Sequence, residues 1–147
     1  MELIQSGMAE IALWEVFSQA RGANATIFLA TVIAVWIAAR FSSVLLEKNV
    51  NLLGKILCTA FAVGVFLFGF NLGGLISGTY EGHAAALASL DVANGDIDIG
   101  AGSQAFIDAM SSGGNTIATV GAYLFYFSGL LIAVSVSYTH LRAHETD

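Results

Sequence analysis

Few residues of this chain combine the type and the spacing that chemistry requires. Asn94, Asp96 and Asp98 alternate along a short acidic segment, as the first ligands of an EF-hand calcium loop do. The glycine of that motif falls one position late here, and Ala105 stands where the loop needs a bidentate Glu. Asn94–Gly95 is also typical of a tight turn. We therefore interpret the segment as a solvated turn or hairpin.

His140 and His144 form a second candidate, because residues four apart share one helix face and could bind a metal together. Both lie in VSYTHLRAHET, residues 136–146, which follows a long apolar stretch and has no helical stripe. This segment resembles the translation of a sequencing adapter from a transposase-based library. The resemblance implies that residues 136–147 are an artefactual tail and that the gene product departs from this chain near Ser135. We therefore exclude both histidines from the functional candidates.

Asn71 is the one strongly polar residue deep inside an apolar stretch. A buried amide in lipid needs a hydrogen-bonding partner, which a neighbouring helix or a transported substrate could supply. We favour the neighbouring helix. A packing role predicts that Asn71→Leu leaves function intact, whereas a transport role predicts loss of transport.

The sequence lacks the residues that other common activities of membrane proteins and enzymes require. No Asp, Glu, Lys or His lies deep in an apolar stretch, which argues against a proton relay, a voltage sensor and a haem site. The Ser, Thr and Cys residues have no adjacent base for nucleophilic catalysis. We expect no enzyme activity, no cofactor and no bound metal.

Composition indicates which elements hold these residues. The chain has 147 residues, of which 56% are hydrophobic and 11% charged, with no proline. A soluble domain carries roughly a quarter charged residues, and the mean hydropathy here is +0.77. The net charge of -6 argues against a nucleic-acid partner. We therefore predict an all-α integral membrane bundle, a single domain over residues 1–135, with the lipid bilayer and other membrane helices as partners.

Three apolar stretches predict membrane-spanning helices over residues 24–46, 52–80 and 115–135, since crossing the bilayer core takes roughly 20 residues. Asn24 is a suitable N-cap for the first of them. Residues 81–114 are acidic and rich in Gly, Ala and Ser, and are predicted to form an outer loop. Within that loop, Ser103 could cap a short surface helix.

Residues 1–22 precede the first span and mix charged with apolar side chains. The apolar ones recur at steps of three and four, which is helical periodicity: Ile4, Met8, Ile11 and Trp14. We predict an interfacial amphipathic helix with Trp14 at headgroup depth. The alternative is an ordinary first helix packed against protein.

Basic residues predict the orientation. Arg40, Lys48 and Lys55 flank the short loop 47–51, and the 81–114 loop has no Lys or Arg. The positive-inside rule then places the short loop in the cytoplasm, with the N-terminus and the acidic loop outside. We expect the inner (plasma) membrane of a prokaryote.

Small residues recur at helical spacing in all three spans. Such residues let helix backbones approach closely, so that dispersion holds the helices together. The second span has two small faces, the larger of which we expect to pack within the chain, while the other leaves room for an oligomer. The residues are Ala60, Gly64, Asn71, Gly74 and Gly78 on the larger face, Gly69 and Gly73 on the other, Ala30, Ala34 and Ala38 in the first span, and Ala118, Ala122, Gly129 and Ala133 in the third.

These patterns predict a small non-enzymatic membrane protein, an accessory or self-assembling subunit that acts through helix packing. The alternative is the N-terminal fragment of a larger transporter or channel whose functional residues lie beyond Ser135.

Overall fold

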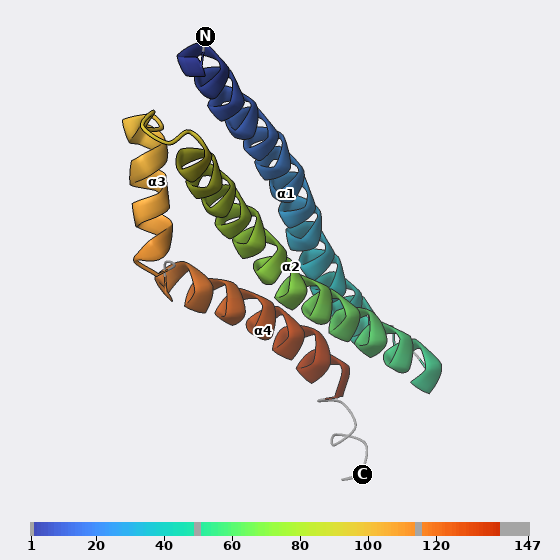
Figure 1. Cartoon of the computed structure of the whole chain (residues 1–147). Helices are drawn as coiled ribbons and strands as arrows, with labels where there is room; N and C mark the ends of the chain where they lie inside the picture. Colours follow the sequence, from blue (N-terminus) through green and yellow to red (C-terminus); the bar gives the residue numbers. More distant parts are fainter. Residues whose placement is uncertain (1, 49–50, 114–115, 139–147) are drawn as a thin grey trace. The chain divides into compact units, whose positions relative to one another are not determined.

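The computed structural model describes residues 2–48, 51–113 and 116–138, which form four helices and contain no strand (Figure 1). The prediction of an all-α fold is confirmed. The helices are α1 (Glu2–Glu47), α2 (Leu52–Ala93), α3 (Ala101–Ser111) and α4 (Thr116–Tyr138). Residues 136–138 of the tail continue α4, and residues 139–147, which include His140 and His144, lie outside the described residues.

Helix α1 merges two elements that the sequence predicts separately. The N-terminal amphipathic segment and the first span are one helix of 46 residues. Asn24 is therefore not an N-cap, and its Nδ2 instead donates a hydrogen bond to Thr79 Oγ1 of α2 at 2.9 Å. Gly22 does not end the helix, because one interior glycine costs only about 1 kcal/mol and no proline follows it.

The predicted loop 81–114 is mostly helical. Helix α2 continues to Ala93, because the Ala- and Leu-rich sequence after Tyr80 has high helix propensity and buries Ala84 and Leu87. The chain then turns at Gly95, whose φ of 63° is readily adopted by glycine. The segment is therefore an exposed turn, as one of the two interpretations expects, and not a hairpin, because helices and no described strands flank it.

Helix α3 also differs from the prediction at its start. Gly100, and not Ser103, occupies its N-cap, and Ser103 is buried inside the helix. The cap has no side-chain hydrogen bond of its own.

The chain divides into two compact units, and α1 and α2 contribute to both. Unit 1 comprises Met1–Thr26 and Gly74–Thr116, and unit 2 comprises Ile27–Gly73 and Ile117–Asp147. The core of unit 1 includes buried Phe17, His83 and Leu87. The core of unit 2 is a cluster of small residues against which Leu130 packs: Ala38, Ala62 and Ala133. These alanines allow the three helices of unit 2 to approach closely.

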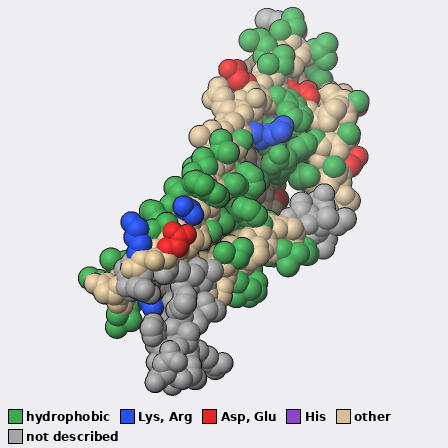
Figure 2. Space-filling model, turned by 180° about the vertical axis from the view of Figure 1, so that it is seen from behind, with side chains coloured by type: hydrophobic (Ala, Val, Ile, Leu, Met, Phe, Trp, Pro, Cys, Tyr) green, Lys and Arg blue, Asp and Glu red, His purple; other side chains and the backbone are tan. Residues whose placement is uncertain are grey.

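Two of the described helices are long and apolar enough to cross a membrane. The candidate segments are Leu3–Leu45 and Leu52–Ala93, and only 17% of the most apolar window of each is buried. Hydrophobic side chains accordingly cover much of the face seen in Figure 2. The third apolar segment, Thr119–Ser135, is shorter. The structure thus supports two candidate spans, and the prediction of three spans is not confirmed.

Candidate functional site

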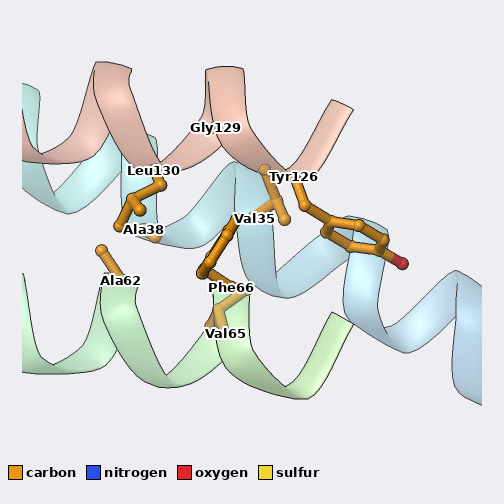
Figure 3. A pocket seen from close by; sticks show the side chains of 8 residues that line it. All are labelled: Val35, Ala38, Ala62, Val65, Phe66, Tyr126, Gly129 and Leu130. Carbon is orange, nitrogen blue, oxygen red and sulfur yellow. The ribbon is translucent and has the colours of Figure 1, made fainter. Parts of the chain in front are cut away.

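One face of α2 carries the packing of unit 2. Along the helix this buried face includes Cys58, Ala62, Gly69 and Leu72. Its partners come from α1 and α4. Figure 3 shows the centre of this packing, where Ala62 and Phe66 of α2 lie among side chains of the two other helices. The side chains labelled in Figure 3 line a cavity of about 10 Å³, which is barely the space of one water molecule.

Two glycines of the predicted small faces lie at these contacts. A side chain at Gly69 would collide with the ring of Tyr126, which itself is only 4% exposed. A Cβ atom at Gly129 would lie 2.6 Å from Val35 Cγ1. Both positions therefore need glycine for close packing.

A buried hydroxyl links the three helices of unit 2. Ser42 Oγ of α1 donates a hydrogen bond to the backbone carbonyl of Ala133 in α4, at 2.6 Å. The same oxygen lies 3.4 Å from Cys58 Sγ of α2. Nothing in the sequence distinguishes Ser42, because serines are common in apolar helices.

The larger small-residue face of α2 is open. A Cβ atom built at Gly64, Gly74 or Gly78 meets no atom within 4 Å, and Ala60 is exposed. Asn71 is also exposed, and its amide makes no hydrogen bond to another described residue. The structure thus packs α2 through the side that carries Gly69, and not through the face that we expected to pack within the chain.

The remaining predicted residues are distributed as follows. Ala38 and Ala133 are buried, Ala34 and Ala122 are half-buried, Ala30 is exposed, and Gly73 is open although Gly69 is not. Of the basic residues, Arg40 and Lys48 are exposed and Lys55 is half-buried. The side chain of Ala118 lies outside the described residues.

Unit 1 contains an aromatic cluster that the sequence patterns do not predict. It joins α1, α2 and α3, and its members are Trp14, Phe17, Tyr80, His83 and Phe106. His83 stacks on Phe17 with ring centroids 4.2 Å apart and meets Trp14 at 4.6 Å. The Arg21 guanidinium lies 5.8 Å from the Phe17 ring. The sequence does contain two pairs of aromatic residues three positions apart, at 14 and 17 and at 80 and 83, and this spacing places each pair on one helix face.

Polar contacts hold α3 against this cluster. Trp14 Nε1 donates to Ser103 Oγ at 2.8 Å, and Ser103 Oγ in turn donates to the Glu10 carboxylate. The Gly100 backbone N–H also donates to Glu10, at 3.1 Å. A carboxylate near a helix N-terminus is favoured by the helix dipole. Trp14 is therefore half-buried against protein, and its predicted position at headgroup depth stays a prediction.

His83 occupies the centre of the cluster with an unpaired nitrogen. The residue is 7% exposed, and its Nε2 has no hydrogen-bonding partner in the part of the chain that the structure describes. His83 lies beyond the predicted span 52–80. Burial lowers the pKa of its imidazole, because the charged form loses solvation.

The acidic turn does not assemble a ligand set. Asn94 Nδ2 donates to Ser6 Oγ at 2.6 Å, and Asp96 and Asp98 are exposed. Within residues 2–48, 51–113 and 116–138, no three His, Cys, Asp or Glu residues come together as metal ligands.

No protein-family model, curated protein or solved structure matches this chain.

Proposed function

We propose that this chain is a small non-enzymatic integral membrane protein that self-assembles through one face of α2. This open face comprises Ala60, Gly64, Asn71, Gly74 and Gly78, all of which are exposed. The observation that carries the proposal is that α2 uses its other side for packing within the chain. A face with this composition permits close backbone approach, and it is available to a second copy.

The length of the helices supports a membrane location. Helices of 46 and 42 residues are about 69 and 63 Å long, roughly twice the 30 Å hydrocarbon core. No charged residue occurs in residues 22–39 of α1 or 56–80 of α2. We place the unit 2 parts of these stretches in the bilayer, and the more highly charged unit 1 outside it.

Exposure of apolar side chains agrees with this placement. Trp36 is 68% exposed and Leu67 is 60% exposed, although both lie in the uncharged stretches. A water-soluble protein would bury most of such a helix, whereas lipid solvates it. Residues 116–135 of α4 contain no charged side chain, and we include this segment as a third span. By the positive-inside rule the loop 47–51 faces the cytoplasm.

Two matched glycine variants test self-assembly. Gly64 and Gly73 are both open, but at 3.6 residues per turn they point about 180° apart around α2. The full chain would carry donor or acceptor dyes in phosphatidylcholine vesicles, and energy transfer would be measured against the protein-to-lipid ratio. Gly64→Ile should weaken association by about tenfold or more, equivalent to about 1.4 kcal/mol, because its side chain separates the backbones.

Gly73→Ile serves as the control and should leave association unchanged. Equal weakening by both variants would mean that the open face is not the interface. A wild-type chain that stays monomeric at every protein-to-lipid ratio would overturn self-assembly altogether.

A further inference from the structure

His83 of α2 is enclosed by side chains from α1 and α3. Trp14 and Phe17 approach it from α1, and Phe106 approaches it from α3 with ring centroids 5.3 Å apart. Phe17 lies parallel to the imidazole, with an interplanar angle of 5°. The ring of His83 therefore forms part of the surface on which α3 rests.

The charged groups of these helices leave the imidazole without a counter-charge. None of the described residues forms an ion pair or a hydrogen bond with His83. On α1, Glu10 is held by Ser103 and Gly100, Glu15 is exposed, and Arg21 lies over the Phe17 and Tyr80 rings. On α2, Glu81 accepts a hydrogen bond from Ser77, and Asp91 accepts one from the Ile99 backbone. On α3, Asp108 accepts a hydrogen bond from Gln104. Arg21 thus adds a positive charge to the same cluster.

We propose that His83 makes the docking of α3 sensitive to acid, so that protonation of its imidazole releases α3 from the other helices of unit 1. A buried, charged N–H without an acceptor is costly. Stacking of the imidazolium on Phe17 offsets only part of that cost, because a cation–π contact does not replace a hydrogen-bond acceptor. Release exposes the imidazolium to water and so removes the penalty.

The direction of the pH dependence follows from the same burial. In the open state the imidazole titrates near its ordinary pKa of about 6.5, and in the closed state burial lowers this pKa. The closed state is therefore fully stable above about pH 6.5 and loses stability as the pH falls below that value. This inference rests on the proposed placement of unit 1 outside the bilayer, but not on self-assembly through α2.

Fluorescence of Trp14 can report release. The full chain with Trp36→Phe has Trp14 as its sole tryptophan and would be examined in dodecyl maltoside micelles. Between about pH 8 and about pH 5, quenching of Trp14 by iodide should rise several-fold. Quenching that does not change over this range would overturn the proposal.

His83→Phe in the same background is the matched variant. Phenylalanine can stack on Phe17 but cannot be protonated, so quenching should stay low throughout the range. Glu10→Gln controls for the carboxylate at the start of α3, and the acid transition should persist in it. A transition that survives His83→Phe, or that disappears in Glu10→Gln, would assign the effect to another group.

A direct titration makes the proposal testable even if His83→Phe fails to fold. The full chain with His140→Gln and His144→Gln retains His83 as its sole histidine. NMR of its imidazole C–H groups should show protonation at the same pH as the change in Trp14 quenching. Protonation at a different pH would separate the two events and contradict the proposal.

Discussion

The ring of Tyr126 on α4 occupies the space that a side chain at Gly69 of α2 would need. Both residues are buried within unit 2. The contact involves the Cδ1, Cε1 and Cζ atoms of a rigid aromatic ring and not the end of a flexible chain. The two helices can therefore keep this contact only while residue 69 lacks a Cβ atom.

Gly69→Ala should destabilise unit 2 by about 1–3 kcal/mol, the usual cost of adding atoms to a packed core. Gly73→Ala is the control, because its new methyl group meets nothing within 4 Å and alanine raises helix propensity by up to about 1 kcal/mol. Unfolding by sodium dodecyl sulfate, followed by circular dichroism in mixed micelles, measures both. Equal stability of the two variants would show that Tyr126 can move aside without cost.

Ser42→Ala should lower the free energy of unfolding by about 1 kcal/mol, because it removes the hydrogen bond from α1 to the Ala133 carbonyl of α4. Ser43→Ala is a neighbouring control, because Ser43 Oγ bonds only the Ala39 carbonyl of its own helix. That substitution should be close to neutral. The same detergent titration applies, and an equal loss in both variants would argue against a special role for Ser42.

Ser103→Ala should reduce the free energy that holds α3 against the rest of unit 1 by about 1–3 kcal/mol. The substitution leaves the Trp14 indole N–H and the Glu10 carboxylate without their shared hydrogen-bonding partner. Hydrogen exchange measured by mass spectrometry should show faster exchange in α3. Ser111→Ala is the control, since Ser111 Oγ bonds the Ile107 carbonyl within the same helix. Unchanged exchange after Ser103→Ala would mean that the aromatic contacts alone hold α3.

Asn71→Leu should leave the unfolding stability unchanged, because the amide is exposed and bonds no other described residue. It should weaken self-association by about threefold or less, since interhelical polar contacts in membranes average about 0.6 kcal/mol. Energy transfer in vesicles measures this effect. A solute flux through wild-type vesicles that Asn71→Leu abolishes would instead favour the transporter alternative.

Local patterns predicted the helical class well, because long apolar stretches without proline leave few alternatives. They failed where a distant residue decides the outcome. Asn24 has the chemistry of an N-cap, yet its amide bonds Thr79 in mid-helix. His83 stood in a predicted loop, and the rings that enclose it come from segments remote in sequence. Glycine spacing identified two faces of α2 but not which of them packs, because that depends on where Tyr126 lies.

The start of α3 depends on a residue that α3 does not contain. Its N-cap is Gly100, and the carboxylate that accepts the Gly100 N–H belongs to Glu10 of α1. An isolated helix of 11 residues is marginal in water. Undocking would therefore unfold α3 as well as displace it, so that this segment gains its order only by binding to the rest of unit 1.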